Sequence, residues 1–150
     1  MPAGASTAEP TVSRVRSAFC CLNARAIDYA RFGLVFLNGG RYNGRQIVPA
    51  DWVTQSTAAL ALGGVDDAAR RNIERPAGPF PAFYACQWRR IAAAAEPAPR
   101  QPGTDFYAQG LYGQVLYIAP GTDTVVLRLG SRSGEVPWPV WLGRVARANP

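Results

Sequence analysis

The segment FYAQGLYGQVLYI, residues 106–118, places two glycines and a glutamine inside a run that otherwise reads as a β-strand. Glycine weakens a strand, and a strand that keeps it often brings its backbone close to another group. Gly110, Gly113 and Gln114 therefore mark the place where backbone atoms of this chain could face a ligand. A β-bulge or a tight strand crossing is the structural alternative for the same two glycines.

Side chains that usually perform nucleophilic catalysis are missing from the sequence. Histidine is absent from all 150 residues, which excludes a Ser-His-Asp triad, a Cys-His dyad and any histidine-based zinc site. All 16 basic residues are arginine, which excludes a Schiff base, a P-loop lysine and a Ser-Lys pair.

Two further motifs have simpler explanations. The sequence GSRSG, residues 130–134, has Arg132 where a nucleophile elbow needs serine, and it predicts a turn. Asp66 and Asp67 are adjacent and point about 100° apart on a helix, which favours a helix surface over an acid–base pair. This sequence alone therefore shows no self-sufficient catalytic apparatus.

Composition indicates one globular domain. The chain is 48% hydrophobic and 17% charged, and a domain of this length buries roughly 70% of its unfolded surface. The net charge is +6, but the arginines are scattered, which favours a solvated surface over nucleic-acid binding. Neither a signal peptide nor a membrane span is evident, so we expect a cytoplasmic chain, as written, without membrane association.

The three cysteines do not suggest a metal site. Cys20 and Cys21 are neighbours, which is poor spacing for a metal knuckle or an ordinary disulfide. Together with Cys86 they are expected to be buried free thiols. No metal or cofactor is predicted.

Hydrophobic periodicity predicts an α+β domain, with an antiparallel sheet flanked by helices. Residues 1–18 read as a flexible lead-in, and residues 19–150 as the folded part. A helix of about four turns follows Asn23 as N-cap and stops at Gly39-Gly40. Its expected apolar face comprises Ile27, Ala30, Leu34 and Leu37. Its expected ion pairs join Arg25, Asp28 and Arg31.

The middle of the chain predicts a hairpin, a short helix and a strand. Asn43-Gly44 is a strong hairpin-turn signal. PADWVTQST, residues 49–57, predicts a helix in which Trp52 is available to pack. Residues 83–90 alternate and are aromatic enough for one strand that places Trp88 in the core, whereas the Arg89-Arg90 pair is expected to be solvated.

The last third predicts two more strands and a helix. Phe106–Gly130 reads as two strands around the turn APGTDT. A terminal helix is expected from about Pro139, with Trp141, Leu142 and Val145 on its apolar side.

These segments, in this order, resemble the serine β-lactamase superfamily, most closely its class C-like, esterase and 6-aminohexanoate-dimer hydrolase branch. LNARAIDYARFGLVFLNGGRYNGRQIVPADWV is similar to the segment after the active-site tyrosine region, and YACQWRR to the following strand. AQGLYGQVLYIAPGTDTVVLRLG is similar to the third active-site box with its paired strands. The resemblance covers about residues 19–147 and implies the C-terminal portion of a β-lactamase/transpeptidase-like fold.

The resemblance also implies roles for the glycine-rich segment. Such enzymes acylate and deacylate the serine of a Ser-x-x-Lys box, with a tyrosine that assists proton transfer. Aligned on its glycines, the third box here is Ala108-Gln109-Gly110. Gly110 is expected to give the substrate clearance, and Leu111 to donate its backbone N–H to the oxyanion hole from an edge strand. The expected substrate contacts are Ala108, Gln109, Tyr112, Gly113 and Gln114.

Departures from the family pattern leave two functions open. Ala108 stands where the family has lysine or histidine, which favours an ester or amide over a β-lactam. No Ser-x-x-Lys is present, and Tyr42 lies in the predicted hairpin. The chain is therefore expected to be either the C-terminal lobe of a truncated serine hydrolase, inactive alone, or a non-catalytic remnant or binding module. The second function would use an exposed sheet edge to bind another chain, and self-association is expected in both cases.

Overall fold

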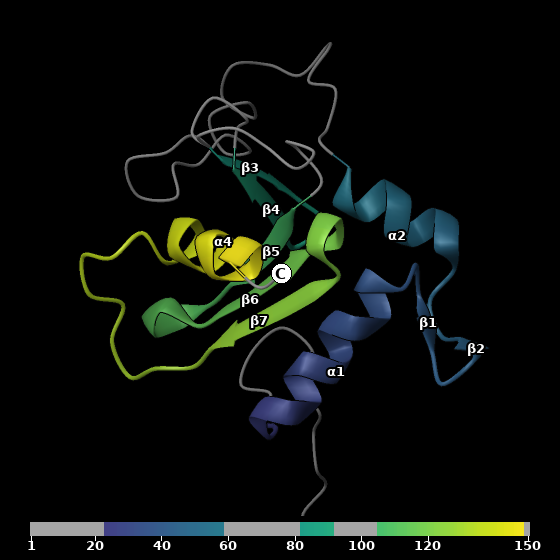
Figure 1. The fold of residues 1–150 in the computed structure, drawn as a ribbon, viewed down its shortest axis with the longest axis horizontal. Helices are drawn as coiled ribbons and strands as arrows, with labels where there is room; N and C mark the ends of the chain where they lie inside the picture. The colour runs from purple at the N-terminus through teal and green to yellow at the C-terminus, as the bar shows by residue number, and fades with distance from the viewer. Residues whose placement is uncertain (1–22, 59–81, 92–104, 149–150) are drawn as a thin grey trace, which may run out of the picture.

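The computed structural model describes residues 23–58, 82–91 and 105–148 (Figure 1). The predicted lead-in, Cys20-Cys21 and Asp66-Asp67 lie outside the described residues. The helices are α1 (Ala26–Leu37), α2 (Ala50–Thr57) and α4 (Trp138–Ala148). A two-stranded hairpin comprises β1 (Arg41–Tyr42) and β2 (Arg45–Gln46). A second sheet comprises β3 (Ala82–Ala85), β4 (Trp88–Ile91), β5 (Phe106–Gln109), β6 (Val115–Ala119) and β7 (Thr124–Arg128).

The five strands of the second sheet are antiparallel and follow one another in chain order, β3-β4-β5-β6-β7. Helices pack on both faces of this sheet (Figure 1). The predicted α+β class, with an antiparallel sheet flanked by helices, is confirmed.

Helix α4 covers one face of the sheet. Val115, Tyr117 and Ala119 of β6 point to this face and pack against Leu142 and Ala146 of α4. These side chains alternate along the strand, as the two-residue period of a strand requires.

Helices α1 and α2 cover the opposite face. Leu116 and Ile118 of β6 pack there in one cluster with Phe36 of α1 and Val53 of α2. Trp88, which is in the core as predicted, joins this cluster, its ring 4.7 Å from that of Phe36. All five residues of β6 are buried, because both of its faces are covered.

The buried side of α1 differs from the prediction. Ile27 and Leu34 are 51% and 37% exposed, whereas Gly33 and Phe36 are buried. Gly33 lets the helix approach β7 closely, since a Cβ there would lie 2.7 Å from Cγ1 of Val125. The helix therefore contacts β7 at Gly33, which has no side chain, and its large apolar residues Ile27 and Leu34 lie away from the sheet.

The ends and ion pairs of α1 follow the sequence with one exception. Arg25, not Asn23, is the N-cap. The glycine stop is confirmed by the positive φ values of Gly39 (59°) and Gly40 (87°). Asp28 is paired with Arg25 and Arg31, each at 2.9 Å.

Helices α2 and α4 form where predicted, but their tryptophans do not turn inward. Trp52 is 51% exposed, and Val53 beside it is buried. Trp141 and Val145 of α4 are also exposed, while Pro139, Leu142, Gly143 and Ala146 are buried. Of the three residues predicted on the apolar side of α4, only Leu142 is buried, and on α2 the smaller Val53 makes the contact for which Trp52 was available.

Residues 83–90 form two strands and not one. Cys86 and Gln87, with φ values of 49° and 70°, make a two-residue turn between β3 and β4. Such turns usually carry asparagine or glycine, and neither occupies positions 86 and 87, so this turn was not predicted. Cys86 is exposed, contrary to the expected buried thiol. Arg90, expected to be solvated, is half-buried and donates Nε–H to the Thr57 carbonyl of α2.

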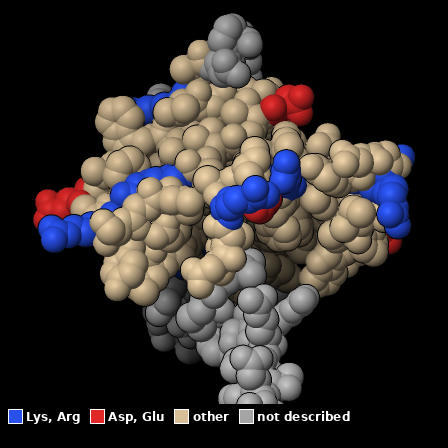
Figure 2. All heavy atoms as spheres, turned by 90° about the horizontal axis from the view of Figure 1, so that it is seen from below, with Lys and Arg blue, Asp and Glu red and all other residues tan. Residues whose placement is uncertain are grey.

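Charged side chains do not form one continuous field on the surface shown in Figure 2, where basic groups are separated by uncharged and acidic ones. No helix within the described ranges has the length and apolarity to cross a membrane. Within the same ranges, no group of three or more His, Cys, Asp or Glu residues could hold a metal ion.

Tyr107 of β5 has a buried hydroxyl group without a described hydrogen-bond partner. Its side chain is only 1% exposed, and its ring stacks on Tyr117 at 6.1 Å. The Tyr107 hydroxyl has no hydrogen-bond partner in the part of the chain that the structure describes. Burial raises the pKa of Tyr107 from 10.0 to about 12, against an opposing effect of Arg89.

This raised pKa predicts a loss of stability at high pH. Below pH 10 the phenol is protonated in both states, so its contribution is constant. Between pH 10 and 12 the unfolded chain loses the proton while the folded chain keeps it, so stability falls by up to about 1.4 kcal/mol per pH unit. Tyr107→Phe should remove this slope and keep the stability at pH 8, since the lost hydroxyl is unpaired. Urea unfolding between pH 8 and 12 measures both effects. Tyr112→Phe, at an exposed site, is the control that should keep the slope, and equal slopes in wild type and Tyr107→Phe would contradict the prediction.

Candidate functional site

The two glycines of the opening segment lie in a turn and not inside a strand. Strand β5 ends at Gln109, and Gly110–Gln114 return the chain into β6. The prediction of two strands over Phe106–Gly130 is therefore wrong, because this range holds three. Strand β5 also lies between β4 and β6, so Leu111 follows an interior strand and not an edge strand.

Hydrogen bonds close this turn around Leu111. The Gly110 N–H donates to the Gln114 carbonyl at 2.8 Å, and the Gln114 N–H donates to the Leu111 carbonyl at 3.3 Å. Leu111–Gly113 form the tight turn between these two bonds, and Tyr112 and Gly113 have positive φ values of 61° and 74°. The Leu111 N–H itself donates to no group among the described residues, and the Leu111 side chain is 75% exposed. The Leu111 N–H is thus a backbone donor without an acceptor among the described residues.

The two glycines have different reasons to be glycine. Gly113 has a φ of +74°, and a Cβ there would lie 3.0 Å from Nη1 of Arg128 and 3.1 Å from Cα of Ser133. Gly110 is extended, with φ −112° and ψ −178°, and a Cβ there would only touch Gln114 at an ordinary 3.6 Å. The fold therefore requires glycine at Gly113, whereas no described neighbour requires it at Gly110.

Tyr112 lies between them in a strained backbone conformation. Its φ of 61° and ψ of 18° are in the left-handed region, which costs a non-glycine residue about 1 kcal/mol or more. Its side chain is 55% exposed, so core packing of the ring does not stabilise this conformation.

The polar groups of the Gln114 side chain are hydrogen-bonded within the protein. Its Nε2 donates to the Gly130 carbonyl at 2.6 Å, and its Oε1 accepts from the Gly130 N–H at 3.0 Å. The side chain was predicted to contact substrate, but both of its polar groups join the start of β6 to the residues after β7.

Arg128 and Trp138 hold the turn from outside, and sequence reasoning missed both. The guanidinium of Arg128 donates to the carbonyls of Gly113 (2.6 Å), Tyr112 (3.2 Å) and Arg132 (2.8 Å). Its Cζ lies 4.0 Å from the centre of the Trp138 ring. The sequence signal for this role was limited to Arg128 as a charged residue within the otherwise apolar run VVLRL, residues 125–129.

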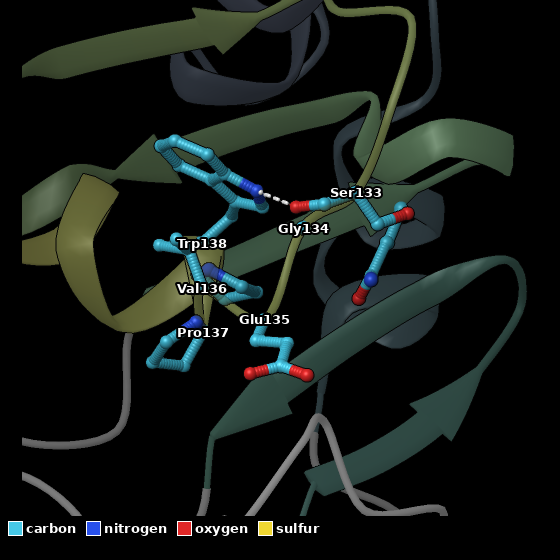
Figure 3. Close-up of a pocket in the computed structure, with 8 residues that line it drawn as sticks. Ser133, Gly134, Glu135, Val136, Pro137 and Trp138 are labelled. Atoms are coloured by element: carbon cyan, nitrogen blue, oxygen red, sulfur yellow. Dashed lines mark hydrogen bonds between the residues drawn. The ribbon is translucent and has the colours of Figure 1, made fainter.

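A small pocket of about 240 Å³ lies between Gln109 and the loop that leads to α4. Figure 3 shows the Trp138 indole N–H donating to the Ser133 carbonyl, at 2.6 Å, across this loop. Side chains alternate along β5, so Gln109 faces this pocket while Ala108 packs toward the cluster under α1. The predicted substrate contacts are thus divided between two sides of the sheet.

A larger, mainly apolar groove lies between the first turns of α1 and the sheet. Its volume is about 720 Å³. It is lined by Ala108, Gly110 and Gln114 together with residues of α1, β6 and the end of β7, including Tyr29, Phe32, Leu127 and Leu129. Asp28 is its acidic lining residue, and hydrogen bonding to Arg25 lowers the pKa of that carboxyl. Asp28 is therefore ionised at neutral pH and cannot serve as a general acid there.

Comparison with known proteins finds similar solved structures but no matching family or curated protein. No protein-family model and no curated protein matches the chain. Among solved structures, the chain is similar to "Putative 6-aminohexanoate-dimer hydrolase from Bacillus anthracis", with a TM-score of 0.54 and 27% sequence identity. The similarity supports the β-lactamase superfamily. The match covers 82% of this chain but 28% of that chain, so the β-lactamase-like fold is partial. The C-terminal position within such a fold stays a prediction.

The two glycines provide a matched pair of substitutions. Gly113→Ala should lower the free energy of unfolding by roughly 1–2 kcal/mol, because alanine is strained at positive φ and crowds Arg128. Gly110→Ala should change it by less than about 0.5 kcal/mol, because the backbone is extended and the added methyl group has room. Urea unfolding measures both values. Equal effects of the two substitutions would contradict the different roles assigned to these glycines.

Proposed function

We propose that this chain is the C-terminal lobe of a β-lactamase-related serine hydrolase that acts on ester or amide bonds. In this proposal residues 19–150 supply the third active-site box, and the Leu111 N–H is an oxyanion-hole donor. The observation that carries the proposal is the unused Leu111 N–H, fixed in a closed turn next to a groove lined by Gly110.

The proposed chemistry explains why a backbone group can do this work. Attack of a serine oxygen on a carbonyl carbon makes a tetrahedral intermediate whose oxygen is negatively charged. A fixed N–H near this oxygen stabilises the transition state by about 3–4 kcal/mol. Leucine can occupy position 111 because its side chain takes no part, and it points to solvent.

The neighbouring residues support an uncharged substrate next to the turn. Ala108 offers no positive charge, so recognition of a substrate carboxylate at that position is not expected. A Cβ added at Gly110 would meet only Gln114, at an ordinary 3.6 Å, so the described residues leave this position uncrowded. The serine, the lysine and the assisting tyrosine belong, in this proposal, to the part of the enzyme that this sequence does not include.

The 150-residue chain should therefore not hydrolyse a nitrophenyl ester by itself. DNA upstream of the Met1 codon should encode a Ser-x-x-Lys box and a tyrosine motif, in frame or after a frameshift. A polypeptide that contains both parts, called the completed enzyme below, should hydrolyse the ester. Leu111→Pro should lower the kcat of this enzyme about 10²–10³-fold by removing the donor. The extended backbone of Gly110 accepts a following proline, so the fold should survive.

Steady-state kinetics with a nitrophenyl ester test this prediction, and Leu111→Ala, which keeps the N–H, is the control. If the rigorously purified 150-residue chain hydrolyses the ester, and Leu111→Pro abolishes this activity, the chain is not catalytically incomplete and the proposal is contradicted. Unchanged kcat for Leu111→Pro in the completed enzyme would contradict the role of the Leu111 N–H.

A second candidate function is binding of another chain through the sheet edge. One observation favours it: β7 lies at the end of the described sheet, with no described strand on its outer side. A terminal strand of a sheet can pair with a strand of another chain when its edge is accessible. A concentration-dependent dimer in size-exclusion chromatography, together with upstream DNA that lacks the Ser-x-x-Lys box, would favour this function over the hydrolase.

A further inference from the structure

Arg128 is held by uncharged groups on all sides that the structure describes. It is the last residue of β7 and is paired with Val115, the first residue of β6. Its guanidinium donates to three backbone carbonyls and lies over the Trp138 ring. No carboxylate of the described residues forms a salt bridge with it. A positive charge therefore remains directly behind the Leu111–Gly113 turn.

The three carbonyl acceptors come from two separate segments. Those of Tyr112 and Gly113 belong to the turn, and that of Arg132 belongs to the loop after β7. Because the guanidinium is planar and rigid, it fixes both segments in one orientation, which a flexible ammonium group cannot do in the same way. Trp138 limits the position of the guanidinium from the side of α4.

These contacts determine the direction of the Leu111 N–H. The turn is closed at its base by the Gly110–Gln114 hydrogen bond. On its far side Arg128 draws the Tyr112 and Gly113 carbonyls toward the sheet and holds Tyr112 at its strained φ of 61°. The peptide of Leu111 lies between these two fixed ends, so it cannot rotate without breaking one of them.

We propose that Arg128 is a positioning residue for the oxyanion donor, acting through the turn and contacting no substrate. The proposal rests on the function proposed above for the Leu111 N–H. It adds a second effect of Arg128, because its positive charge favours negative charge on an oxygen bound at that N–H.

Amide hydrogen exchange of the ¹⁵N-labelled 150-residue chain tests the positioning directly. Arg128→Lys keeps the charge but loses the planar group. It should speed the exchange of the Gly110 and Gln114 amide protons about tenfold or more and shift the Leu111 amide signal. Arg144→Lys is the matched control, since Arg144 lies 5.3 Å from the Trp141 ring centre on α4 and no hydrogen bond or ion pair among the described residues joins it to the turn. Its exchange rates at Gly110 and Gln114 should stay within about twofold of wild type.

Circular dichroism shows whether Arg128→Lys and Arg144→Lys are folded. Unchanged Gly110 and Gln114 exchange in folded Arg128→Lys would overturn the positioning role, as would equal effects of Arg128→Lys and Arg144→Lys.

Kinetics of the completed enzyme separate this inference from the proposed function. Arg128→Lys should lower kcat for a nitrophenyl ester at least about tenfold with KM within about twofold. It should add little to Leu111→Pro, because both act through one N–H. Full additivity of the two substitutions would overturn the inference. Absence of any hydrolysis by the completed enzyme, with the exchange result as expected, would overturn the hydrolase function while the positioning of the turn by Arg128 stands.

Discussion

Burial of β6 on both faces is the constraint on which the arrangement of the chain depends. Its odd-numbered residues pack under α4 and its even-numbered residues under α1 and α2. A one-residue change of register would exchange these two sets, so β6 can pair with β5 and β7 in only one way. That register fixes where β5 must end and β7 must stop, and therefore where Gly110–Gln114 and Arg128 meet.

Sequence periodicity predicted the helices and most strands but not which side of each helix is buried. Turn and stop signals at Asn43-Gly44 and Gly39-Gly40 depend on local backbone preferences, and they were right. The inward side of α1 depends instead on how closely Gly33 can approach Val125, which is a contact between residues far apart in the chain. The turn at Cys86-Gln87 was missed for the opposite reason, because these residues have no local preference for positive φ.

In the candidate site, too, local features were predictable and contacts between distant residues were not. The glycines marked the right segment, and the resemblance selected Leu111 within it. Sequence alone could not show that the Gln114 side chain is hydrogen-bonded to Gly130, or that Arg128 is hydrogen-bonded to the turn. Both contacts join residues at least 15 positions apart. A position whose contribution is an N–H also leaves no chemical signature in its side chain, so no residue type at position 111 could have identified it.

The described contacts that hold the turn join residues between Gly110 and Trp138. Every described contact that shapes it, from the Gly110–Gln114 hydrogen bond to the stacking of Arg128 on Trp138, lies within this stretch of the chain. The contacts that orient the donor are thus local in sequence, within two strands, their connections and the first turn of a helix. The position of this turn against the rest of the sheet still depends on β5 and on the helices that bury β6.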